Sequence, residues 1–164
     1  MGRMWRTLIV SFVVAAALAA AAVRLGEARD AAQVLQDAGR VATRAAAAHA
    51  VSLLSIDHRT IEADMKRVEA TSTGEQREEF IRGEPALRQA TLDNKVVQTG
   101  ALRATGLESM SADRTSAEVL IAADAVIHWE DGRKAAPEER FFRWRMEVSK
   151  VGGIWLVSRS ELVQ

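Results

Sequence analysis

An uncharged, apolar run near the N-terminus most limits how this chain can fold. Residues 8–23 read LIVSFVVAAALAAAAV, with Arg3 and Arg6 before them and mixed charges after them. Together with the residues just before it, the run approaches the ~20 residues that a helix needs to cross a hydrocarbon core of ~30 Å. We therefore expect a single membrane-spanning helix. Its anchoring side chains are expected to be Leu8, Ile9, Val10, Phe12, Val13, Val14, Leu18 and Val23.

The charges on either side of this run predict its orientation. Arg3, Arg6 and the amino terminus precede it, whereas the segment that follows is close to neutral. Because positive charge is retained on the inner side, we expect a cytoplasmic N-terminus at the plasma membrane and an extracytoplasmic domain. The small residues at 17–22 also fit a signal peptide whose cleavage would release a secreted domain. Both interpretations export the domain.

Composition and charge exclude several classes of function. The 164 residues include 22 Lys and Arg, 22 Asp and Glu, and no cysteine. The charges alternate along the chain, so no basic field is available to bind nucleic acid. Without cysteine there are no disulfides, thiolate metal ligands or cysteine nucleophiles. The length leaves room for one domain after the membrane segment.

The first half of the exported part has the periodicity of helices. Apolar residues at helical spacing and the absence of proline predict one long helix over about 27–56, continuous with the membrane segment or hinged near Gly26. We expect a tail and anchor at 1–25, a helical stalk at 26–45 and the domain at 46–164. Ile61, Met65 and Val68 predict a second, short helix.

A third helix is expected to begin at Thr73. The spacing of Thr73 and Gln76 matches a capping box, in which each side chain would bond a backbone amide at the helix start. Gly83 and Pro85 are expected to interrupt this helix. Proline lacks an amide donor and disfavours a helical conformation in the residue before it.

The pattern after residue 94 changes from helical to alternating. Segments 95–107, 115–129 and 141–151 are predicted strands, and Gly152–Gly153 can form a tight turn to a fourth strand. That turn predicts three cross-strand pairs: Val151 with Ile154, Lys150 with Trp155, and Val148 with Val157. Helices followed by a four-stranded antiparallel sheet predict an α+β fold with the helices on one face.

The segment 141–151 alternates most cleanly, which predicts one packed and one wet face. The packed face is expected to hold Phe142, Trp144, Met146 and Val148. The wet face is expected to hold Arg143, Arg145, Glu147 and Ser149. The register between the second and third strands stays open, because residues 130–139 form a loop of undetermined geometry.

No residue pattern indicates catalysis or a cofactor. His49, His58 and His128 are the only histidines, and Glu62 is the one carboxylate a helical turn from any of them. A metal site needs three or four ligands, so none is indicated. The sequence also lacks a Gly-x-Ser-x-Gly elbow and a phosphate-binding glycine loop. We therefore expect a protein that is not an enzyme.

Two groups of side chains remain as candidate sites. Charged residues gather around the predicted start of the second helix, where capping and surface pairing are expected and contact with a partner protein is an alternative. These residues are Asp57, Arg59, Glu62 and Asp64. Large apolar residues on the strands are expected to form the core, with a ligand pocket as the alternative. These residues are Phe142, Trp144, Met146 and Trp155.

Three short motifs and the order of the elements give a family resemblance. The first motif comprises Leu53, Leu54, Ser55, Asp57, Arg59 and Thr60; the second, Thr73 and Gly74; the third, Gly153, Trp155, Leu156 and Val157. On these residues the chain resembles the actinobacterial mammalian-cell-entry (Mce)-associated membrane proteins. The resemblance implies a cone-shaped NTF2-like or cystatin-like domain, in which helices rest in a curved sheet. It also implies an accessory role beside Mce lipid importers.

Three functions follow as expectations. The first is a non-enzymatic, membrane-anchored accessory protein of an Mce-type lipid or sterol transport complex, in contact with transporter subunits or other envelope proteins. The second is an extracytoplasmic domain that binds a small apolar ligand, such as a lipid or sterol, in the concave sheet. The third is an isomerase or dehydratase that shares the fold. The absence of tyrosine disfavours it, because such enzymes pair a buried acid-base group with tyrosines.

Overall fold

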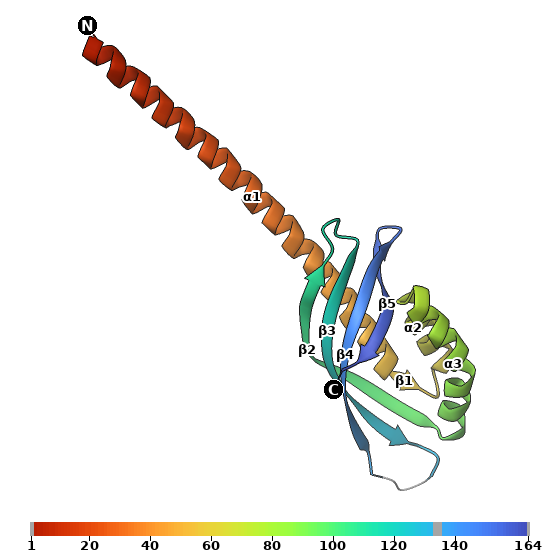
Figure 1. Cartoon of the computed structure of the whole chain (residues 1–164). Coiled ribbons are helices and arrows are strands. Elements are labelled where there is room, and N and C mark those ends of the chain that lie inside the picture. The colour runs from red at the N-terminus through yellow and green to blue at the C-terminus, as the bar shows by residue number, and fades with distance from the viewer. Residues whose placement is uncertain (1, 133–135, 164) are drawn as a thin grey trace. The chain divides into compact units, whose positions relative to one another are not determined.

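The structure is a computed structural model of the whole chain (Figure 1). It describes residues 2–132 and 136–163, except for the side chains of residues 2–22, 28 and 31. Two compact units make up the chain, Met1–Ala38 and Gly39–Gln164. The boundaries predicted after residues 25 and 45 stay predictions.

One long helix, α1 (Gly2–Leu54), passes through Gly26 without a break and ends two residues before the predicted limit. In the first unit its large apolar side chains that are described, among them Val34 and Leu35, are exposed. Among the residues whose side chains are described, no helix is long and apolar enough to cross a membrane. The side chains of the predicted anchor other than Val23 lie outside the described residues, so the anchor stays a prediction.

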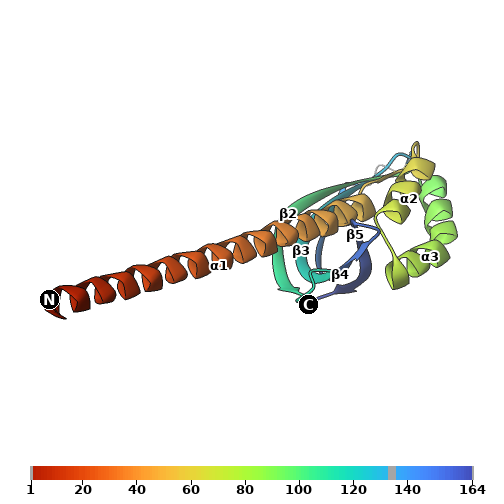
Figure 2. The same ribbon diagram turned by 90° about the horizontal axis from the view of Figure 1, so that it is seen from above.

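The second unit follows the predicted order of helices and then strands. After α1 come β1 (Ile56–Asp57), α2 (Ile61–Ala70) and α3 (Gly74–Asp93). The long strands are β2 (Val96–Met110), β3 (Ser116–Trp129), β4 (Glu138–Val151) and β5 (Ile154–Leu162). The fold class α+β is therefore confirmed, and the sheet curls around the last turns of α1 (Figures 1 and 2).

The sheet has five strands in the order β1-β2-β3-β4-β5, so the predicted count of four is wrong. The additional strand, β1, is two residues long and pairs Ile56 with Gln98 and Asp57 with Val97. Two residues are too few to give an alternating pattern, which is why the sequence did not reveal it. All four adjacent strand pairs are antiparallel.

The core lies between the inner face of the sheet and one face of α1. The helix contributes residues spaced by four, which lie on one side of an α-helix: Ala42, Ala46, Ala50 and Leu54. The sheet contributes Val119, Ile121, Ala123, Trp144, Met146, Val148, Trp155 and Val157. Alanine side chains let α1 approach the strands closely, so the helix fills the concave face.

The hairpin between β4 and β5 has the predicted register. Val151 pairs with Ile154, Lys150 with Trp155, and Val148 with Val157. Gly152 and Gly153 have φ values of 58° and 88°, the left-handed conformation that glycine adopts without strain. Trp144, Met146 and Val148 are buried and Phe142 is half-buried, whereas Arg143 and Glu147 are exposed. The predicted packed and wet faces of β4 are therefore confirmed.

Two expectations for the third helix are wrong. Helix α3 begins at Gly74, but neither side chain of the expected capping box forms a cap bond at Thr73. The buried Gln76 turns into the domain instead, where its amide oxygen accepts a hydrogen bond of 2.6 Å from Ser160 Oγ. The helix also continues through Gly83 and Pro85. Both residues are exposed, so the carbonyl that Pro85 leaves without an amide partner can face water.

Two short contacts cover parts of the sheet edges. Ser72, between α2 and α3, forms a parallel bridge with Val157 of β5. At the other edge, β1 pairs only with the first part of β2. Strand β2 also has irregular pairing with β3 between Leu102 and Ala104 and between Leu107 and Ser109, the positions of two bulges.

Candidate functional site

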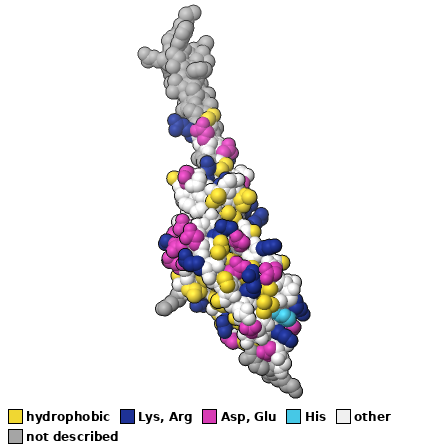
Figure 3. All heavy atoms as spheres, turned by 90° about the vertical axis from the view of Figure 1, so that its right-hand side faces the viewer, with side chains coloured by type: hydrophobic (Ala, Val, Ile, Leu, Met, Phe, Trp, Pro, Cys, Tyr) yellow, Lys and Arg dark blue, Asp and Glu magenta, His cyan; other side chains and the backbone are white. Residues whose placement is uncertain are grey.

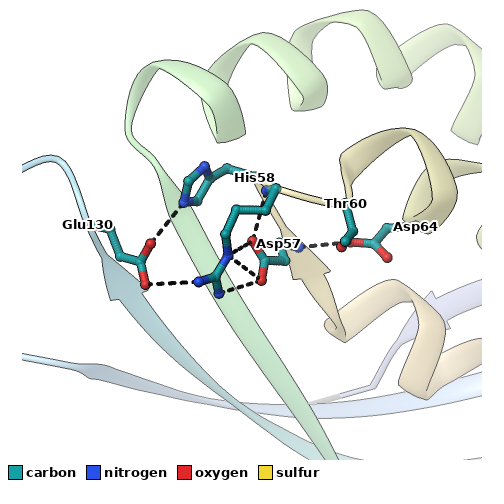
Figure 4. Close-up of polar contacts among 6 residues, drawn as sticks. Asp57, His58, Thr60, Asp64 and Glu130 are labelled. Atoms are coloured by element: carbon teal, nitrogen blue, oxygen red, sulfur yellow. Dashed lines mark hydrogen bonds and ion pairs between the residues drawn. The ribbon is translucent and has the colours of Figure 1, made fainter.

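A polar cluster lies where β1 leads into α2. Arg59 donates from its backbone amide and its Nε to Asp57 Oδ1, at 2.8 Å and 2.9 Å, and from Nη2 to Oδ2 at 2.6 Å (Figure 4). The hydrogen bond from the Arg59 guanidinium lowers the pKa of Asp57 from 3.8 to about 2. Asp57 therefore stays ionised at any physiological pH, which does not suit a general acid.

Asp64 joins β1 to α2 within this cluster. The residue is 3% exposed, and its Oδ2 accepts hydrogen bonds from the Asp57 amide at 2.9 Å and from Thr60 Oγ1 at 3.0 Å (Figure 4). Oδ1 accepts a hydrogen bond from the Arg67 guanidinium. A buried carboxylate with this many donors has a structural role, because it accepts the hydrogen bond of a backbone amide at a turn.

Glu130, just after β3, completes the cluster from a distant part of the sequence. Its Oε2 lies 2.9 Å from His58 Nε2, and its Oε1 lies 3.7 Å from Arg59 Nη1. The hydrogen bond from His58 is the main reason that the pKa of Glu130 is lowered. The contact ties the segment between β1 and α2 to the end of a central strand (Figure 4).

The four predicted partner-contact residues therefore do not form one group. Asp57, Arg59 and Asp64 belong to the cluster, whereas Glu62 pairs with Arg88 of α3 at 3.0 Å. Arg59 and Glu62 keep 58% and 66% of their side-chain surface exposed. They remain accessible to a partner, while Asp64 does not. No group of three potential metal ligands occurs among the described residues.

The predicted pocket residues lie mainly in the core. Met146 and Trp155 are buried beneath α1. Phe142 stacks on Trp144 with ring centroids 5.0 Å apart and an interplanar angle of 12°. These contacts fill the space that a ligand would need on this part of the concave face.

A separate hollow of about 200 Å³ lies between α3 and the end of the sheet. Apolar residues, including Ile56, Ile127 and Trp129, share its lining with Thr91, Asn94, Gln98 and Arg140. Arg140 donates to Glu138 at 2.6 Å, which raises the pKa of Arg140 further. No sequence pattern predicted this hollow. The available signal was weak: Thr91 stands between Ala90 and Leu92, and Gln98 follows Val96 and Val97.

His49 is a buried titratable group outside both sites. Its Nδ1 lies 2.8 Å from Thr71 Oγ1, and its Nε2 has no hydrogen-bond partner among the described residues. Burial lowers the pKa of His49 to about 4. The ring is therefore neutral near pH 7 and links α1 to the end of α2.

Several solved structures share this architecture. The periplasmic domain of DotI superposes with a TM-score of 0.61 at 11% identity, covering 74% of this chain and 91% of that one. An IcmL-like type IV secretion system protein from Legionella pneumophila gives 0.58 at 10% identity, covering 74% and 91%. A "Putative Scytalone Dehydratase" from Novosphingobium aromaticivorans gives 0.54 at 13%, covering 82% and 86%. The chain thus contains an α+β domain of the NTF2-like fold with a curled antiparallel sheet.

Sequence comparison identifies the family. Residues 5–164 match the family described as "Uncharacterized protein Rv1363c/MT1408-like", and the chain belongs to this family. It is 33% identical over 113 residues to the protein Rv1363c of Mycobacterium tuberculosis. The match covers 69% of this chain and 42% of that relative's length. Both findings fit an actinobacterial family.

Proposed function

We propose that the protein is a non-enzymatic accessory protein of an Mce-type lipid or sterol transport complex in the cell envelope. The observation that carries the proposal is the filling of the concave face by Ala42, Ala46 and Ala50 of α1. A domain whose concavity is occupied by its own helix is better suited to contact other proteins than to enclose a substrate.

The comparisons support this proposal at the level of fold. The names of the DotI domain and the IcmL-like protein describe a periplasmic location and a type IV secretion system, respectively. Domains of this fold are thus used in envelope machines. The Mce complex is proposed because of the motifs around Asp57 and Trp155, and because the family is actinobacterial.

The proposal includes a membrane anchor at residues 8–23, with the N-terminus in the cytoplasm and the domain outside. Alkaline carbonate extraction of native membranes should leave the full-length chain in the pellet. Protease added to intact spheroplasts should digest the domain. A mature N-terminus near Ala22 would favour the secreted alternative, and protection from protease would contradict the orientation.

The exposed charges next to the polar cluster are the proposed contact surface. On the face shown in Figure 3, side chains of both signs are interspersed with hydrophobic ones, a mixed surface of the kind seen at the rims of protein interfaces. Arg59 and Glu62 are more than half exposed, and each has a partner within the domain. Surface ion pairs contribute only about 0–1 kcal/mol to folding, so they can be altered without unfolding the domain.

Affinity purification of the full-length chain from its own membranes tests the proposal. Mass spectrometry should identify Mce importer subunits among the co-purifying chains. The double variant Arg59→Gln, Glu62→Gln should recover several-fold less of them. The matched control Glu78→Gln, Arg82→Gln changes the same residue types on the exposed surface of α3 and should recover the wild-type amount. Purification without any importer subunit would overturn the accessory function.

A small-ligand binder is the second candidate, favoured by the hollow of about 200 Å³ under α3. The polar side chains of Asn94, Gln98 and Arg140 in its lining would bond the polar end of a small ligand, and the apolar lining residues would contact the rest of it. Native mass spectrometry that detects a stoichiometric small molecule, lost in Gln98→Leu, would favour this function. An enzyme has less support, because Arg140 is the one ionisable residue in this described lining.

A further inference from the structure

A hollow of about 340 Å³ lies on the outer face of the sheet, opposite α1. Small residues from neighbouring strands, Ala104 and Gly106 of β2 and Ala122 of β3, leave the backbone uncovered there. Leu120 and Arg143 border the hollow. The result is an apolar depression on a face that also carries charged side chains, among them Glu118 and Arg145.

A large aromatic side chain projects beside this depression. Phe141 is 73% exposed and stands two residues before Arg143 on β4, so both side chains lie on the outer face. Leu120 is 40% exposed on the same face. An exposed phenylalanine next to an open apolar depression costs solubility, and such patches mark sites of association.

The outward-facing side chains of β4 are complementary to those of a second copy of β4 that runs in the opposite direction. It reads Glu139, Phe141, Arg143 and Arg145, that is, an acid, an aromatic ring and two bases. If two copies of β4 cross antiparallel with a two-fold axis near residue 142, Glu139 faces Arg145 and Phe141 faces Arg143. Glu139 and Arg143 form no ion pair within the described part of the chain, whereas Arg145 is paired with Glu108 at 2.8 Å, so Glu139 of the other copy would join an existing pair.

We propose that the outer face binds a second copy of this chain in a two-fold symmetric dimer. Phe141 of each copy enters the depression beside Arg143 of the other. The ring buries apolar surface over Gly106 and Ala122, and the guanidinium lies over its face in a cation–π contact. An isologous interface requires projection and depression on the same face, and this face carries both.

Two variants test the contact between Phe141 and the depression, one by removing the side chain and the other by filling the depression. Phe141→Ala removes the projection. Gly106→Leu fills the depression, and a Cβ at Gly106 meets nothing within 4 Å, so the domain tolerates a side chain there. With the purified full-length chain in mild detergent, sedimentation velocity should give a dimer for the wild type. Each variant alone should be a monomer, with association weakened at least 10-fold.

Mixing the two variants provides the decisive test of the dimer contact. The Gly106→Leu copy retains Phe141, and the Phe141→Ala copy retains the depression, so one of the two contacts can form in a mixed dimer. Differently tagged variants should therefore co-purify with each other, although neither co-purifies with itself. Loss of folding could not produce this complementation.

A matched control removes an exposed apolar side chain elsewhere. Ile154, at the β4–β5 turn, is 65% exposed, and Ile154→Ala should remain dimeric. A monomeric wild type at tens of micromolar would overturn the proposal. So would dimers that persist in both variants, or folded variants that fail to pair when mixed. These experiments use the pure protein, so they are independent of any importer partner.

Discussion

Gly100 of β2 lies directly against Leu54, the last residue of α1. A Cβ at Gly100 would be 2.5 Å from Leu54 Cβ and 3.2 Å from its carbonyl carbon. The strand and the end of the helix are therefore in contact through a position that only a hydrogen atom can occupy. This contact holds the end of α1 at the sheet, just before the polar cluster begins.

Gly100→Ala should destabilise the domain by about 1–3 kcal/mol, because the added methyl group overlaps Leu54 Cβ, an atom that moves only with the backbone of α1. Urea unfolding followed by circular dichroism measures the change. Gly39→Ala is the matched control: its Cβ would lie 2.9 Å from Leu107 Cδ2, the flexible end of an exposed side chain. Alanine also favours the helix, so this variant should be neutral or slightly more stable.

Trp144→Ala should cost roughly 3–5 kcal/mol, because it empties a buried site that the ring shares with Phe142 and the α1 alanines. Glu147→Ala, an exposed residue on the outer face of the same strand, should change stability by less than about 0.5 kcal/mol. Thermal unfolding of both variants gives the comparison. Equal losses for the two would contradict the assignment of the two faces of β4.

Pro85→Ala should stabilise the domain by up to about 3 kcal/mol, since proline inside a helix lacks a donor and crowds the preceding turn. Gly83→Ala nearby should add roughly 0.5–1 kcal/mol, and its Cβ meets nothing within 4 Å. Differential scanning calorimetry measures both. A destabilised Pro85→Ala protein would argue that α3 is broken at this point.

Asp64→Ala should destabilise the domain by about 1–3 kcal/mol, because it leaves the Asp57 amide and the Thr60 hydroxyl without their acceptor. Glu62→Gln, two residues earlier on the exposed side of α2, should change stability by less than about 1 kcal/mol. Hydrogen exchange should also be faster at the Asp57 amide in Asp64→Ala. Unchanged exchange there would show that another group holds β1.

His49 should make stability depend on pH. Burial lowers its pKa from the ordinary value of 6.5 to about 4 in the folded protein, so the unfolded chain binds the proton more tightly. The neutral ring's contribution is present above about pH 6.5 and is lost as the pH falls toward 4, by up to about 1.4 kcal/mol per pH unit. Urea titrations between pH 5 and 8 should show this slope, and His49→Gln should flatten it. A parallel slope in His49→Gln would assign the effect to other groups.

Local patterns predicted the parts of the fold that depend on local chemistry. The alternation in β4 and the turn at Gly152–Gly153 determined which residues are buried and how β4 pairs with β5. Contacts between distant segments were not predictable in this way. Glu130 meets His58 across 72 positions in the sequence, and Gln76 meets Ser160 across 84.

The charged candidate site was therefore only partly predictable. The helix-start pattern correctly brought Asp57, Arg59 and Asp64 together, because they are separated by at most two turns of chain. Glu62 shares that stretch but points to Arg88 of α3, and only the packing of α2 on α3 decides this. The hollow at Arg140 depends on where four separate segments meet, around residues 56, 87–98, 127–129 and 140, so no single window of sequence contains it.

The bulges of β2 have a consequence for how copies of this domain can meet. Beyond Gln98 the outer edge of β2 pairs with no strand in the described sheet, and a straight edge of this length would template fibre growth. The irregularities at Arg103 and Glu108 shift the spacing of its amides and carbonyls. A strand added to this edge could therefore form regular backbone hydrogen bonds over only a few residues. Amyloid-like strand addition at the free edge of β2 is therefore disfavoured. The outer face of the sheet remains available for specific association.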